Sequence, residues 1–248
     1  MITYASNTLT LAISQARLGD GASAASTLAA GAPYLAKLRA AEPPGSLSPV
    51  LVENIVHIGS AAVAYLLGDV DRARQIAADS VGQLQAAKTV GSFQASQVAI
   101  TAYYGLHTMG RVDYLHGDYA AAEREERQAL ADRKQWSTEG TQDQRDLAEV
   151  STWLAMSLAK QGKLAEALGG IAPVLKFQRE LAARNHGDIW QPTELAAALY
   201  AQALADPPHR AALLKEAAAL LDGAAPALKP LREIRQWRET VSQAQHKI

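Results

Sequence analysis

Apolar residues recur along this chain at the spacing of one face of an α-helix, and short polar turns separate the apolar segments. In one such segment Ser48 can act as an N-cap and Pro49 suits the first helical turn. The apolar positions that follow are Val50, Leu51, Ile55, Ile58, Ala62 and Leu66. Because the same helical period returns throughout the chain, we predict an all-α fold.

One turn sequence separates successive helices four times. It is Gly-Asp followed by an Ala four residues after the Asp, with Lys in place of Asp in the fourth copy. Glycine permits the positive φ that ends a helix, and alanine lets the next helix approach closely. Each copy therefore predicts an antiparallel pair of helices. The copies are Gly19-Asp20 with Ala24, Gly68-Asp69 with Ala73, Gly117-Asp118 with Ala122, and Gly162-Lys163 with Ala167.

The four turns are regularly spaced. Gly19 and Gly68 are 49 residues apart, as are Gly68 and Gly117, and Gly162 follows 45 residues later. This regularity predicts a solenoid of stacked helix pairs that forms one domain over residues 1–248. The expected pairs cover residues 3–45, 48–91, 92–136, 141–185 and 191–222, and a capping helix covers 228–246.

Two segments depart from the pattern. Gly169, Gly170 and Pro173 lie inside the helix after the fourth turn, so we expect a kink or a break near Pro173. In the fifth pair the segment 205–208, Ala-Asp-Pro-Pro, replaces the glycine turn between expected helices at 194–204 and 209–221.

The start of the chain carries few charges. Arg17 and Asp20 are the only charged residues between positions 1 and 36. A solenoid normally ends in a polar face, so an uncharged first helix pair indicates that something covers it. There are two alternatives for what covers it: an upstream segment lies over residues 1–36, or the chain associates with itself into a homo-oligomer.

Composition excludes several classes of function. The net charge of −1 does not favour nucleic acid, and the chain has no cysteine, no phosphate-binding glycine motif and no short histidine spacing for zinc. We therefore expect no cofactor, no metal and no enzymatic activity. The apolar segment 47–67 contains Glu53, Asn54 and His57, which argues against a membrane span. The N-terminus lacks the basic start of a secretory signal, so we expect a cytoplasmic protein, or a periplasmic one if the chain belongs to a membrane-anchored protein.

The third turn and its flanks resemble the tetratricopeptide repeat, and the stretch 117–131 is similar to the longer repeats of kinesin-light-chain type that are common in bacterial regulatory proteins. The matching residues are Leu106, Met109, Gly110, Tyr114, Gly117, Asp118, Tyr119, Ala122 and Ala129. The resemblance implies a right-handed superhelix, in which the first helix of each pair lines a concave groove that binds peptide segments of other proteins.

If the first helices line a groove, the third and fourth pairs supply its aromatic and polar side chains. Aromatic residues and arginine are enriched among the anchors of protein interfaces. The alternative for each residue is core packing between neighbouring helix pairs. The candidate partner-binding residues are Tyr104, His107, Arg111, Tyr114, Thr152, Trp153, Met156 and Lys160.

The sequence thus favours a non-catalytic scaffold that binds a protein or peptide partner, as the sensory or assembly region of a larger bacterial regulator. Two alternatives remain for the function. One is a self-assembly module that associates through its apolar N-terminal helix, and the other is a small-molecule sensor coupled to an effector.

Overall fold

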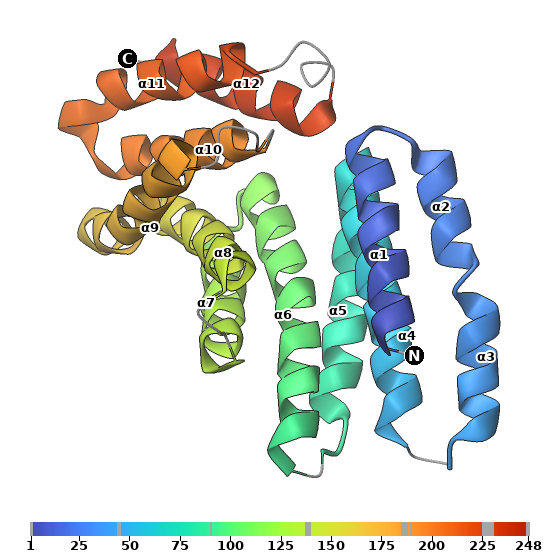
Figure 1. Ribbon diagram of the computed structural model, residues 1–248. Coiled ribbons are helices and arrows are strands. Elements are labelled where there is room, and N and C mark those ends of the chain that lie inside the picture. Colours follow the sequence, from blue (N-terminus) through green and yellow to red (C-terminus); the bar gives the residue numbers. More distant parts are fainter. Residues whose placement is uncertain are drawn as a thin grey trace. The chain divides into compact units, whose positions relative to one another are not determined.

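The computed structural model is all-helical, as predicted, and the residues that it describes form no strand (Figure 1). These are residues 2–43, 46–89, 91–136, 140–184, 188, 190–224 and 231–246, with only the backbone of residues 2–6, 32 and 136. The expected limits at residues 45, 185 and 228 lie outside the described residues. The chain divides into two compact units. Unit 1 consists of Met1–His116 and Gln128–Trp136, and unit 2 consists of Gly117–Arg127 and Ser137–Ile248. The expectation of one continuous domain stays a prediction.

Unit 1 is built from helices that pack mainly against their neighbours in sequence. Helix α4 packs against α1, α2, α3, α5 and α6, and α5 packs against α6 as well. The second half of α7 also belongs to this unit. The helices are α1 (Ile2–Arg17), α2 (Gly21–Ala29), α3 (Ala32–Ala41), α4 (Leu47–Leu67), α5 (Val70–Ala86), α6 (Gly91–His116) and α7 (Tyr119–Trp136).

Unit 2 contains the first half of α7 and the helices that follow. Helix α10 packs against α8, α9, α11 and α12, and α11 packs against α12 (Figure 1, yellow to red). The helices are α8 (Thr141–Lys160), α9 (Leu164–Arg184), α10 (Gln191–Ala205), the 3₁₀ turn η1 (Pro207–His209), α11 (Arg210–Asp222) and α12 (Arg232–Gln245).

The repeated turns have the predicted geometry. Gly19, Gly68, Gly117 and Gly162 all have positive φ, between 78° and 98°. In the first three turns the Asp side chain caps the next helix, because it accepts a hydrogen bond from the backbone N–H three residues later. The alanine of each turn, Ala24, Ala73, Ala122 or Ala167, is fully buried. The first, second and fourth turns join helices that pack on each other, α1 on α2, α4 on α5 and α8 on α9, as the sequence predicted.

Close packing continues between successive helix pairs of unit 1. Leu51 and Ile58 of α4, Leu84 of α5 and Ala102 of α6 form one buried cluster. A Cβ atom at Gly105 of α6 would lie 2.7 Å from Val81 Cγ2 and 3.4 Å from Ile58 Cδ1. Glycine at this position lets three helices meet without a gap.

Several expected boundaries were wrong. The second arm of the first pair is broken into α2 and α3, because Gly31 caps a new helix and Pro33 lies in its first turn. Helix α4 begins at Leu47 with Ser46 as its cap, so Pro49 is its third residue, where an N–H has no helical partner. Helix α5 ends at Ala86, five residues before the expected limit at Gly91.

Of the two alternatives near Pro173, the break is wrong, and the kink stays a prediction. Helix α9 runs from Leu164 to Arg184 with Pro173 inside it. A proline ring meets the carbonyl of the residue four positions earlier, here Gly169, and both Gly169 and Gly170 have open space around the Cα atom. We attribute the continuity to this freedom of the two glycines.

Helix α4 is, within the described part of the chain, the one helix long and apolar enough to cross a membrane, with a mean hydropathy of 1.7 in its most apolar window. Half of that window is buried by the helices of unit 1. Length and composition alone do not separate a core helix from a membrane span, so the expectation of no membrane span stays a prediction.

Candidate functional site

The four candidate residues on α6 differ in exposure. Tyr104 is 43% exposed, and its ring makes an edge contact with Tyr103 at 4.5 Å between centroids. His107 is buried and lies parallel to Tyr103, with 6.3 Å between the ring centroids. The guanidinium carbon of Arg111 lies 4.1 Å from the ring centroid of Tyr65 on α4, and Tyr114 is half-buried. Tyr104 is therefore the candidate of this helix that offers most surface to a partner.

The candidates on α8 are mostly buried. Met156 has no exposed surface, and the Thr152 hydroxyl donates to the Ala148 carbonyl oxygen at 2.8 Å. Trp153 is 5% exposed and packs on Trp237 of α12, with 5.9 Å between ring centroids. Lys160 is exposed. Thr152, Trp153 and Met156 thus occupy core positions, as the packing alternative describes.

The α6 and α8 candidates belong to different units. Tyr104, His107, Arg111 and Tyr114 lie within one α6 sector at helical spacing, whereas only Lys160 of the α8 set reaches the surface. That these residues bind a partner stays a prediction.

An exposed stripe on α6 was missed by the sequence reasoning. Phe93 is 72% exposed, Gln97 and Ile100 are half-buried, and Tyr104 follows four residues after Ile100. The spacing of 4, 3 and 4 residues places all four on one side of the helix. We call these residues the α6 stripe. The helical spacing of Phe93, Ile100 and Tyr104 was the signal in the sequence.

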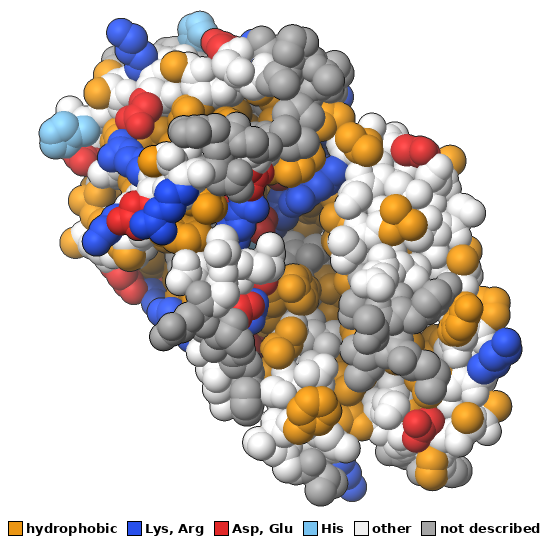
Figure 2. Space-filling view, viewed as in Figure 1, with side chains coloured by type: hydrophobic (Ala, Val, Ile, Leu, Met, Phe, Trp, Pro, Cys, Tyr) orange, Lys and Arg blue, Asp and Glu red, His pale blue; other side chains and the backbone are white. Residues whose placement is uncertain are grey.

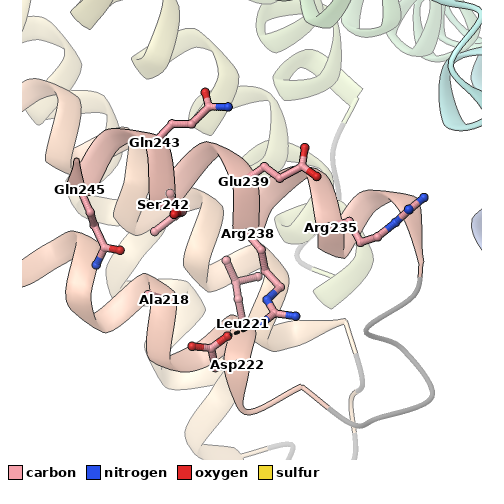
Figure 3. Close-up of a pocket in the computed structure, with 10 residues that line it drawn as sticks. Ala218, Leu221, Asp222, Arg235, Arg238, Glu239, Ser242, Gln243 and Gln245 are labelled. Carbon is pink, nitrogen blue, oxygen red and sulfur yellow. Dashed lines mark hydrogen bonds and ion pairs between the residues drawn. The ribbon is translucent and has the colours of Figure 1, made fainter. Parts of the chain in front are cut away.

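A groove of about 560 Å³ lies between α11 and α12 in unit 2 (Figure 3). Its apolar side is formed by Ala218, Leu221 and Val241. Arg238 and Gln245, seven residues apart on α12, point toward α11, whereas Glu239 and Gln243 project from another side of the helix (Figure 3).

Two polar contacts join α12 to α11 beside this groove. Arg238 Nη2 lies 2.7 Å from Asp222 Oδ1, and Gln245 Nε2 donates to the Leu214 carbonyl oxygen at 3.3 Å. The small side chain of Ala218 lies between them in the α11 sequence. The groove therefore combines an apolar floor with charged and amide groups, as ligand sites often do. The sequence marked α12 only as a cap, because nothing in it placed α11 opposite.

Glu123 is the centre of a polar contact between α7 and the turn after α8, within unit 2. Its carboxylate accepts hydrogen bonds from Lys163 Nζ at 2.5 Å, Gln161 Nε2 at 2.8 Å and Arg127 Nε at 2.9 Å. Arg127 also pairs with Glu166 of α9. Partial burial raises the pKa of Glu123, but the three donors together outweigh burial, and the pKa lies below its ordinary value.

A second polar cluster joins α8, α9 and the start of α10. Arg145 pairs with Asp188 and with Glu194, the latter at 3.3 Å, and buried Gln191 donates to the Gln178 side-chain and backbone oxygens at 2.8 Å. Burial is the main cause that raises the pKa of Glu194, and the nearby carboxylates add to it while Arg145 opposes them. These contacts connect the start of α10 to α8 and α9, so we interpret the cluster as a structural contact.

In the part of the chain that the structure describes, no group of three His, Cys, Asp or Glu side chains is placed to hold a metal ion. No protein-family model matches the sequence, and comparison with curated proteins gives no significant match.

Proposed function

We propose that this protein is a non-catalytic scaffold of tetratricopeptide-like helix pairs that binds a protein or peptide partner through the exposed side of α6. The α6 stripe carries the proposal. Large aromatic side chains are costly to leave in water and are enriched at interface anchors, and Phe93 and Tyr104 are among the most exposed large apolar residues of the described chain.

The buried neighbours of the stripe support the same role. Tyr103 lies beneath Tyr104, and the guanidinium carbon of Arg133 on α7 lies 5.7 Å from the Tyr103 ring centroid. Tyr104 therefore packs on one side against a buried ring, and this contact lowers the side-chain entropy lost when a partner covers Tyr104.

Selection from a random peptide library tests the proposal. Peptides enriched on the wild-type protein are titrated by fluorescence anisotropy against the Phe93→Ala/Tyr104→Ala variant. We expect binding to weaken at least about tenfold, since loss of an aromatic anchor costs roughly 1–2 kcal/mol or more.

Tyr34→Ala is the matched control, because Tyr34 is an equally exposed tyrosine on α3. It should bind the selected peptides like the wild type. Equal affinities of all three proteins, with unchanged helical content and melting, would place the binding surface elsewhere and reject this site.

A small-molecule sensor is the second candidate function, and the groove between α11 and α12 favours it. A ligand bound there would raise the melting temperature of the protein. Ala218→Met should fill the groove and abolish that rise, whereas Ala211→Met, at an exposed position of the same helix, should keep it. A thermal-shift screen in which no compound discriminates the two variants would remove this candidate.

A further inference from the structure

Two junctions between helix pairs in unit 1 can be compared residue by residue, because Gly19, Gly68 and Gly117 are spaced by 49 residues. At the first junction α2 and α3 lie beside α4, and at the second junction α5 lies beside α6. The same spacing makes Tyr104 of α6 the equivalent of Ile55 of α4. The surroundings of these two residues differ in a way that indicates what binds to the α6 stripe.

At the first junction α3 covers Ile55. Leu38 of α3 and Val52 of α4 form a buried cluster, and Leu35 and Ile55 pack against it. The two leucines are three residues apart, so they lie on one side of α3. A short helix of the chain itself therefore covers this position on α4.

The second junction lacks the corresponding turn of helix. Helix α5 ends at Ala86, whereas α3 continues for four residues beyond the equivalent position 37, to Ala41. Leu38 thus corresponds to Ala87, the cap residue of α5, whose backbone is extended. An alanine is too small to replace the leucine, and Tyr104 is 43% exposed.

Helix α6 also begins earlier than α4. Its first residue, Gly91, corresponds to position 42, which is five residues before α4 begins at Leu47. Phe93 lies in this additional turn and is 72% exposed. Figure 2 shows orange side chains over the lower half of α6, its N-terminal half, with white groups between them. We attribute the exposure of the stripe to the early end of α5.

The charges at the two junctions differ in the same way. At the first junction Arg39 of α3 forms an ion pair with Glu53 of α4. Lys88 corresponds to Arg39, but Ala102 stands in place of Glu53. Lys88 is exposed and pairs with no residue that the structure describes. The carboxylate of the first junction is therefore missing from the second.

The rest of α6 offers no exposed acidic group. Its one acidic residue, Asp113, is buried and paired with Arg74 of α5. Two cationic residues, Lys88 and Arg111, lie before and after the stripe in the sequence. Because interfaces favour opposite charges, these surroundings favour an acidic partner over a basic one.

We propose that the α6 stripe binds an acidic amphipathic helix of a partner protein, in the place that the end of α3 takes on α4. This inference rests on the proposed function and names its partner. Phe93 and Tyr104 are 11 residues apart, or about 16 Å along α6, so three turns of a partner helix span the stripe. Apolar side chains three or four residues apart contact the stripe, and a carboxylate pairs with Lys88.

The sequences and conformations of the selected peptides test this inference. The relevant peptides are those whose binding weakens at least about tenfold on the Phe93→Ala/Tyr104→Ala variant. We expect them to share large apolar residues at three- and four-residue spacing, with Asp or Glu between them. A proline placed at the centre of such a peptide breaks its helix and should weaken binding at least about tenfold in fluorescence anisotropy.

The possible outcomes separate this inference from the proposed function. Peptides that depend on Phe93 and Tyr104 but are basic, or that tolerate the central proline, would overturn the inference and leave the proposed function standing. Selection that yields no peptide dependent on these residues would overturn both.

A charge exchange tests the role of Lys88. Lys88→Glu should weaken binding of the acidic peptides about two- to fivefold at low salt, the range of exposed ion pairs, and should strengthen binding of the same peptides with Lys in place of each acidic residue. Lys215→Glu, at an exposed position of α11, makes the same change in net charge and should alter neither affinity. Equal effects of the two substitutions would overturn the inference.

Discussion

At the scale of single residues, three hydrogen-bond donors converge on the carboxylate of Glu123, whose side chain is only 12% exposed. We expect Glu123→Gln to lower the free energy of unfolding by about 1 kcal/mol at pH 7, because exposed Arg127 and Lys163 are partly screened by water. Urea unfolding measures the difference.

The effect of Glu123 depends on pH with a defined sign. Its pKa is lower in the folded protein than in the unfolded chain, so its contribution is present above the unfolded pKa and is lost as the pH falls through the folded pKa. The difference in stability between the wild type and Glu123→Gln should therefore be constant above the ordinary glutamate pKa of roughly 4.3 and shrink as the pH falls below it. A difference that does not shrink on acidification would show that Glu123 acts through packing.

Trp153 and Tyr104 make an informative pair of substitutions. Trp153→Ala removes a buried ring from the contact with Trp237, and we expect a loss of about 3–5 kcal/mol in stability. Tyr104→Ala removes a half-exposed ring, so we expect a loss below about 1 kcal/mol. Chemical unfolding of both variants measures the losses, and equal losses would contradict the core and surface positions described for them.

At the scale of helices and turns, substitutions of glycine should have opposite effects on stability in a turn and inside a helix. Gly68 has φ of 98°, so Gly68→Ala should cost about 1–2 kcal/mol. Gly82 lies inside α5 with no atom near its Cα hydrogens, so Gly82→Ala should stabilise the protein by roughly 0.5–1 kcal/mol. Thermal unfolding gives both values, and the same sign for both variants would refute the assigned turn geometry.

The turns could be predicted because their cause is local. A positive φ at Gly19, Gly68, Gly117 and Gly162 and a buried alanine after each turn follow from a few adjacent residues. The break between α2 and α3 had a local signal too, since Gly31 precedes Pro33. The continuity of α9 across Pro173 had none, because it depends on how the backbone adjusts around Gly169.

The candidate site could be predicted only in part. Helical spacing identified Tyr104 on a first helix, but the same rule selected Trp153, which α12 covers. Which side of a helix is covered depends on partners far along the chain, and Trp237 lies 84 residues after Trp153. The groove between α11 and α12 could not be predicted either, because it depends on which helix packs against α11.

At the scale of the whole molecule, the helices of each unit pack mainly on their neighbours in sequence. Helix α4 contacts α1, α2, α3, α5 and α6, and half of its most apolar window is buried. Stacked helix pairs bury the apolar sides of their helices in this way.

Nuclear Overhauser effects between methyl groups test this packing most directly. In the methyl-labelled protein we expect cross-peaks that connect Ile58 of α4, Leu84 of α5 and Ala102 of α6, and a cross-peak between Val81 and the α protons of Gly105. Absence of these cross-peaks, or cross-peaks from the same methyl groups to helices of non-neighbouring pairs, would contradict the stacked helix pairs.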